Sequence, residues 1–63
     1  MQPHQERVVI EKNQVSERLH ALLVFFEGPI FRTLPEAEQT RMRNQARFMD
    51  GYVACLEDRI RAF

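Results

Sequence analysis

Apolar residues in the first half of the chain recur at the spacing of a helix. The intervals between them are seven, four, three and four residues. The positions are Val8, Val15, Leu19, Leu22 and Phe26. An α-helix turns once in about 3.6 residues, so these side chains lie on one face. We therefore predict a helix over about residues 3–26, with Pro3 in its first turn.

Lys12 is the exception in this pattern, because it falls on the apolar face between Val8 and Val15. Two interpretations are open. The aliphatic stem of Lys12 packs along the apolar face while its ammonium group reaches water, or the ammonium group binds an anion. Arg7 and His4 lie about one and two turns earlier and are close enough to assist in anion binding.

The sequence between the two halves predicts a turn over residues 27–34. Gly28 can adopt the positive φ that ends a helix, and the proline that follows cannot continue it. Pro35 fits the first turn of a second helix. Thr33 and Glu36 have the spacing of a capping box.

The second half of the chain carries a nearly regular heptad pattern. The positions are Met42, Gln45, Met49, Tyr52, Leu56 and Phe63. This spacing predicts a second helix over about residues 35–61. Residues 1–63 are therefore expected to form one all-α domain, a two-helix antiparallel hairpin.

Several apolar residues lie off both predicted faces. They are Val9, Ile10, Leu23, Phe25, Phe48, Val53 and Ile60. Two helices share only one mutual face, so these side chains cannot all be buried within the hairpin. A core of this size rarely supplies more than about 3–5 kcal/mol, and the single cysteine, Cys55, excludes an internal disulfide. We expect the hairpin to assemble into a helical homo-oligomer.

Composition and charge argue against several classes of function. Nine basic and nine acidic residues give a net charge of zero, which argues against a protein that coats DNA. No apolar run approaches the ~20 residues of a membrane span. Cys55, His4 and His20 lack the spacing of metal ligands. Ser16 and His20 could touch on one helix face, but no third group orients the histidine. We expect a protein without catalytic residues, metal or cofactor.

The best candidate for ligand binding is a basic cluster in residues 40–48, which holds three arginines and no acid. Arg43 and Arg47 are i,i+4 neighbours, so they project together and could hold phosphate groups. The alternative is a solvated basic face paired with glutamates of the first helix. Tyr52, further along the same helix, is either a core aromatic with a satisfied hydroxyl or a platform for a nucleobase.

Short patterns across nearly the whole chain resemble a family of small phage-encoded proteins. They are Pro3-His4-Gln5, Arg7-Val8-Val9, Glu11-Lys12, Phe31-x-x-Leu34, Glu36-x-Glu38-Gln39 and Gln45-x3-Met49-x2-Tyr52-x3-Leu56-x2-Arg59-Ile60-x2-Phe63. The family includes anti-CBASS proteins, sponges that sequester the cyclic oligonucleotide signals of bacterial immunity and are not enzymes. The resemblance implies a helical homo-oligomer, a hexamer as in the best-understood members. It would bind cyclic di- or trinucleotides between protomers in the host bacterial cytoplasm.

The resemblance implies a ligand role for Lys12, which matches the lysine of the family's Glu-Lys motif. Ligand roles for Arg43, Arg47 and Tyr52 rest on charge and spacing in this chain. Members that bind cyclic dinucleotides have more chain before the first long helix, including a tyrosine that contacts the ligand. Here no tyrosine or phenylalanine precedes Phe25, so we expect one ligand class to be lost or bound differently. The alternative function is an oligomeric helical adaptor that binds a protein partner through its apolar face, and nucleic-acid binding through the arginines is a remote third.

Overall fold

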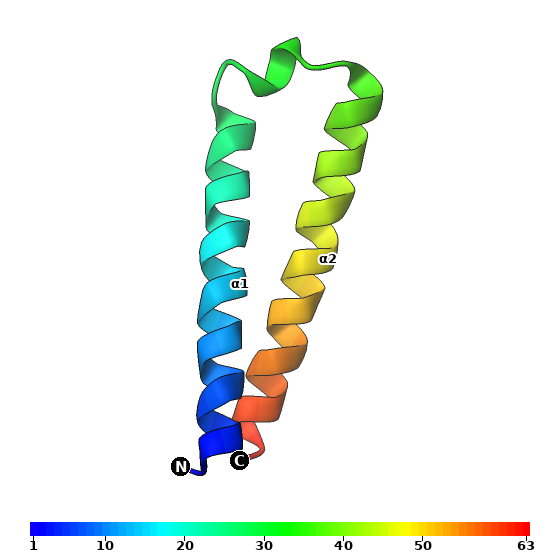
Figure 1. The fold of residues 1–63 in the computed structure, drawn as a ribbon. Helices are drawn as coiled ribbons and strands as arrows, with labels where there is room; N and C mark the ends of the chain where they lie inside the picture. Colours follow the sequence, from blue (N-terminus) through cyan, green and yellow to red (C-terminus); the bar gives the residue numbers. More distant parts are fainter.

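The computed structural model describes all 63 residues and consists of two long antiparallel helices (Figure 1). Helix α1 spans Pro3–Glu27 and α2 spans Glu36–Arg61, and the short 3-10 helix η1, Phe31–Thr33, lies in the connection. Both chain termini lie at the same end of the hairpin (Figure 1). The prediction of an all-α, two-helix hairpin is confirmed. The helix ends fall within one residue of the predicted ranges 3–26 and 35–61.

The start of α1 is fixed by backbone and side-chain hydrogen bonds. Pro3 occupies the first helical position, where its missing N–H needs no partner. The backbone N–H of Gln2 donates to Oε1 of Gln5 at 2.9 Å. The carbonyl of Gln2 accepts the N–H groups of Gln5 and Glu6, each at 3.0 Å. These contacts satisfy groups that a bare helix end would leave unpaired.

The connection between the helices differs from the predicted turn. Gly28 has a φ of −81°, so it does not adopt the positive φ that we expected. The N–H of Gly28 donates to the carbonyl of Phe25 at 3.1 Å, which ends α1 without a left-handed residue. Pro35 lies just before α2 rather than in its first turn.

The predicted capping box of Thr33 and Glu36 is wrong. The hydroxyl of Thr33 donates to the carbonyl of Ile30 at 2.6 Å, because η1 brings that carbonyl within reach. The start of α2 is instead tied to the connection by Gln39, whose Nε2 donates to the carbonyl of Leu34 at 2.9 Å.

Phe31 closes the end of the hairpin where the helices are joined. Its side chain is only 3% exposed. Its ring centroid lies 4.6 Å from that of Phe26 and 6.2 Å from that of Phe25, the latter in an edge-to-face arrangement. The guanidinium of Arg43 lies over the same ring, 5.1 Å from its centroid. Phe31 therefore links the last turn of α1 to α2 through favourable aromatic and cation–π contacts.

A row of side chains on α1, spaced alternately three and four residues apart, is buried or half-buried. It consists of Gln5, Val8, Lys12, Val15, Leu19, Leu22 and Phe26. This is the face predicted for the first helix. The corresponding row on α2, the inner row, consists of Met42, Ala46, Met49, Val53, Leu56 and Ile60. Every member of the inner row is also buried or half-buried.

The predicted face of the second helix is therefore only half right. Gln45 and Tyr52, which we placed on it, are exposed, as is Phe63. Val53 and Ile60, which we placed off it, are half-buried in the inner row. The two sets share Met42, Met49 and Leu56. They differ because the inner row takes Ala46 and Val53, each one residue after a position that we predicted, so the buried face is turned by only part of the ~100° that separates consecutive residues.

The hairpin is a rod rather than a globule. Its principal extents are 46 × 15 × 13 Å, and its radius of gyration is 14.5 Å, against about 10.6 Å for a compact domain of this length. Only five of the 63 residues are buried. Ile10, Leu23 and Phe48 are 55%, 46% and 68% exposed. A single copy therefore leaves much of its apolar surface in water. Burying that surface would stabilise the protein.

Replacing Phe31 with alanine should unfold most of the protein. Truncating a buried phenylalanine costs about 3–5 kcal/mol, which is comparable to the whole stability expected of so small a core. Urea denaturation followed by far-UV circular dichroism measures the loss. Ile30→Ala is the matched control, because Ile30 is adjacent in sequence but 60% exposed, and it should change stability by no more than ~0.5 kcal/mol. Equal midpoints for the two variants at one protein concentration would contradict the role of Phe31.

Candidate functional site

Lys12 lies in the interface between the helices without a carboxylate partner. It is half-buried, and its neighbours in the row, Val8 and Val15, are each only 7% exposed. The ion pairs in the structure are made elsewhere, by Glu38 with Arg41 and by Asp58 with Arg61. The charge of Lys12 is therefore not neutralised within the chain, so it remains available to an anion.

Arg43 and Arg47 stack on aromatic rings instead of pairing with acids. Arg43 lies over Phe31, and Arg47 lies over Phe48 with 5.2 Å between its guanidinium carbon and the ring centroid. No ion pair connects either arginine to a glutamate of α1, which was the alternative to anion binding. Because neither guanidinium makes an ion pair, its N–H groups remain available to phosphate oxygens.

Arg41 is the one arginine of the cluster that is neutralised. Its Nε lies 2.8 Å from Oε1 of Glu38, one turn earlier on the same helix. Both side chains are exposed, so the pair contributes little to stability. The charge available to a ligand in this cluster therefore comes from Arg43 and Arg47.

The predicted ligand residues do not converge within one copy of the chain. The antiparallel arrangement places the start of α1 beside the end of α2 (Figure 1), so Lys12 is level with about residue 52. At 1.5 Å per residue, Arg47 and Arg43 lie about 7 and 13 Å further along the rod, toward the connection. The exposed residues His4 and Arg7 lie in the opposite direction, toward the open end of the hairpin.

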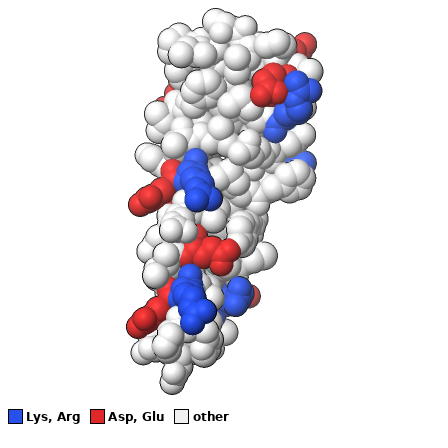
Figure 2. Space-filling view, in the orientation of Figure 1, with Lys and Arg blue, Asp and Glu red and all other residues white.

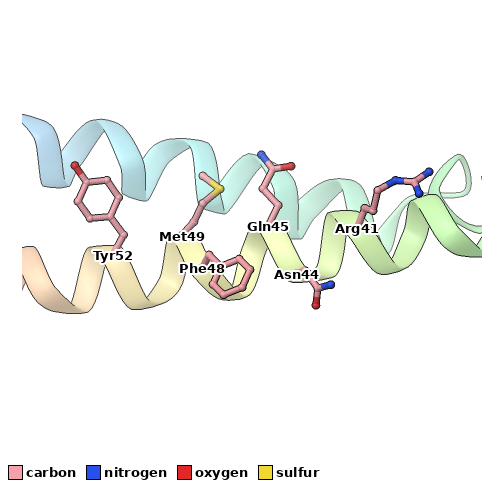
Figure 3. A pocket seen from close by; sticks show the side chains of 6 residues that line it. All are labelled: Arg41, Asn44, Gln45, Phe48, Met49 and Tyr52. Atoms are coloured by element: carbon pink, nitrogen blue, oxygen red, sulfur yellow. The ribbon is translucent and has the colours of Figure 1, made fainter.

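One shallow groove is present, and it lies along α2. Its volume is about 500 Å³. It is lined by Arg41, Asn44, Gln45, Phe48, Met49 and Tyr52, all of which project from one stretch of α2 (Figure 3). Tyr52 is 43% exposed here, so it is not the core aromatic that was one of its two interpretations. Asn44, Gln45 and Phe48 were not among the predicted site residues, although the off-face position of Phe48 was a signal for this surface.

Neither sign of charge dominates the face of the rod shown in Figure 2. Figure 2 shows basic and acidic side chains beside one another along the face in view, with broad uncharged areas between them. No cluster of three or more potential metal ligands is present. Neither helix combines the length and hydropathy that a membrane-spanning segment requires. The candidate binding features of this chain are therefore local pairs of a cation and an aromatic ring.

Comparison with known proteins identifies the family of this chain. The family model named Sequestin matches residues 2–62. The chain is 36% identical over 63 residues to an uncharacterized 7.5 kDa protein in the denB-rIIB intergenic region of Enterobacteria phage T4, covering 100% of this chain and 98% of that protein. No solved structure matches. The T4 relative confirms the resemblance to small phage-encoded proteins. With nearly its whole length matched, the chain belongs to the Sequestin family.

Proposed function

We propose that this protein sequesters cyclic oligonucleotide second messengers of bacterial immunity and does not cleave them. The name of its family denotes sequestration, and its T4 relative belongs to a phage. The protein would therefore act in the cytoplasm of the infected host, where such messengers are made.

The observation that carries this proposal is a set of cations without carboxylate partners, located beside apolar or aromatic groups. Lys12 lies between Val8 and Val15 in the buried row of α1, and Arg43 and Arg47 lie over phenylalanine rings. A cyclic oligonucleotide presents one negative charge at each phosphodiester and a flat base beside it. Ammonium and guanidinium groups bind the phosphates, and an exposed ring such as Tyr52 stacks against a base.

The proposal includes assembly into a homo-oligomer, a hexamer as the family resemblance implies. Lys12 and the two arginines are spread along one rod, and a single copy supplies each only once. Symmetry repeats each cation around a ring-shaped ligand. The exposure of Ile10, Leu23 and Phe48 supports association, because contact between copies would remove apolar surface from water.

The second candidate is an oligomeric adaptor that binds a protein partner. The groove along α2 and the 68% exposure of Phe48 favour it, because an apolar groove of this kind accepts the side chains of a helix. Calorimetry against a panel of cyclic di- and trinucleotides distinguishes the two candidate functions. Heat with at least one nucleotide supports sequestration, and no heat with any of them favours the adaptor.

The purified protein should have a mass several times that of its 7.5 kDa chain. Multi-angle light scattering at micromolar concentration measures it, and six copies correspond to about 45 kDa. The physical reason is the apolar surface that one hairpin leaves exposed. A folded monomer that persists across concentrations would exclude the proposed assembly.

Removing the unpaired cations should weaken ligand binding by orders of magnitude while leaving the oligomer intact. Each charge-assisted contact contributes about 1.5–3 kcal/mol, equivalent to roughly 10- to 150-fold in affinity, and symmetry repeats the loss. The variants are Lys12→Ala and the double substitution of Arg43 and Arg47 by alanine, measured by calorimetry.

Arg18→Ala is the control for these variants. Arg18 is exposed and makes neither an ion pair nor a contact with an aromatic ring, so its loss should leave affinity nearly unchanged. Circular dichroism shows whether the arginine double variant stays folded without the Arg43–Phe31 contact. Affinities like wild type for both the lysine and the arginine variants would show that the ligand binds elsewhere.

A bound cyclic nucleotide should be recovered chemically intact. The complex is denatured by heat, and the released nucleotide is analysed by chromatography and mass spectrometry after incubation with excess protein. Binding through charge and stacking breaks no bond. Release of linear or hydrolysed nucleotide would identify an enzyme instead of a sponge.

A further inference from the structure

Asn44, Arg47 and Phe48 form a cluster on the side of α2 that faces away from α1. Their spacings of three and four residues place them on one helix face, and all three are exposed. Figure 3 shows Asn44 and Phe48 on the side of α2 away from α1, and both line the groove. We name these three residues the outward cluster. None of them belongs to the inner row that packs against α1.

Phe48 presents one open face of its ring. The guanidinium of Arg47 lies over the ring, 5.2 Å from its centroid, and so occupies one of its two faces. The side chain is nevertheless 68% exposed, so the opposite face is open to solvent. An aromatic ring in this state is a platform on which a nucleobase stacks.

Asn44 supplies a hydrogen-bonding group beside this ring. It lies one turn before Phe48, and its carboxamide makes no hydrogen bond within the chain. A carboxamide donates through its NH₂ group and accepts through its oxygen. Adenine offers the matching pair, because its N6 amino group donates and its N7 accepts. Guanine presents two acceptors at this edge, O6 and N7, so the same carboxamide can satisfy only one of them.

We propose that the outward cluster binds one adenine nucleotide. Phe48 stacks on the base, and the Asn44 carboxamide pairs with its N6 and N7 atoms. Arg47, which has no carboxylate partner, binds the adjacent phosphate. This inference rests on the proposed sequestration and deepens it, because it names the base that the messenger carries. All three groups come from one chain, so the subsite is complete in a single copy.

The polar groups of the outward cluster favour a nucleotide over an apolar helix of a protein partner. A helix docked on Phe48 by its apolar face would cover Asn44 and Arg47 without offering them a hydrogen-bond partner or an anion. Polar groups covered in this way are destabilising. A nucleotide supplies both partners, and the groove volume of about 500 Å³ lies within the ~300–1,000 Å³ of small-molecule sites.

Nuclear magnetic resonance with adenosine 5′-monophosphate (AMP) and guanosine 5′-monophosphate (GMP) tests the subsite. Millimolar AMP should shift the side-chain amide signals of Asn44 and the ring signals of Phe48. GMP should bind about 5- to 150-fold more weakly, which is the discrimination that one bidentate pair provides. Equal affinities for the two nucleotides, or no shift at the outward cluster with either of them, would overturn the proposal.

Substitutions at Asn44 separate base selection from stacking. Asn44→Leu has a similar size but cannot form the pair, so AMP should bind as weakly as GMP. Asn44→Arg should reverse the preference, because arginine pairs with O6 and N7 of guanine. Phe48→Leu should weaken AMP and GMP alike, by about 5- to 150-fold, because stacking is lost. A wild-type ratio of AMP to GMP affinity in both Asn44 variants would exclude Asn44 as the residue that selects the base.

Gln45→Ala is the matched control. Gln45 carries the same carboxamide and also lines the groove, but Figure 3 shows it on the side of α2 toward α1. Its loss should leave the ratio of AMP to GMP affinity unchanged, and a loss of preference as large as in Asn44→Leu would contradict the assignment. The substituted residues are all exposed, so circular dichroism should show wild-type helix content for every variant.

Calorimetry with cyclic diadenylate and cyclic diguanylate extends the test to messengers and keeps the two proposals apart. Cyclic diadenylate should bind more tightly, by about 5-fold or more. Equal affinities that Asn44→Leu leaves unchanged would overturn the adenine subsite while sequestration holds. Binding of AMP through Asn44, with no binding of any cyclic nucleotide, would support the subsite and overturn sequestration.

Discussion

The packing of Phe31 between the two helices is the contact on which the hairpin depends. The rows that join α1 and α2 bury few side chains completely, and Phe31 is the largest of the five residues that are buried. Its ring touches two rings of α1, and Arg43 of α2 lies over it. One side chain in the connection therefore holds both helices in an antiparallel arrangement. Phe31 also positions Arg43, which we propose as a phosphate ligand. The residue that stabilises the fold therefore also supports the proposed binding site.

A two-helix rod has no true interior, and this limits what its interface can contain. Lys12 is tolerated in the apolar row because the rod is only 13–15 Å across. Its stem can lie along Val8 and Val15 while its ammonium group reaches the edge of the interface. The two interpretations of Lys12 are therefore compatible. A lysine that reaches solvent from an apolar row presents an unneutralised charge at a fixed position, as a ligand for an anion must.

The same thinness explains the apolar side chains that α2 leaves exposed. A helix that packed on one neighbour alone would need one apolar face, and its exposed side would be polar. Instead, Phe48 and Tyr52 remain exposed although α2 already packs against α1 through its inner row. Apolar surface of this kind is costly in a monomer and is useful where copies meet. The proposed assembly follows from this surplus, and it would repeat cations that a single copy holds apart.

The sequence by itself determined both helices and the buried face of α1, because one 3.6-residue pattern dominates there and no second pattern competes. It did not determine the buried face of α2. Either Gln45 and Tyr52 or the residues that follow them, Ala46 and Val53, could occupy the buried face, because both sets fit a heptad. Only the docking of α1 selects between them. The tertiary structure also decided how Arg43 is held, because the ring beneath it, Phe31, comes from outside α2. The local pattern of the sequence carries no information about such a contact.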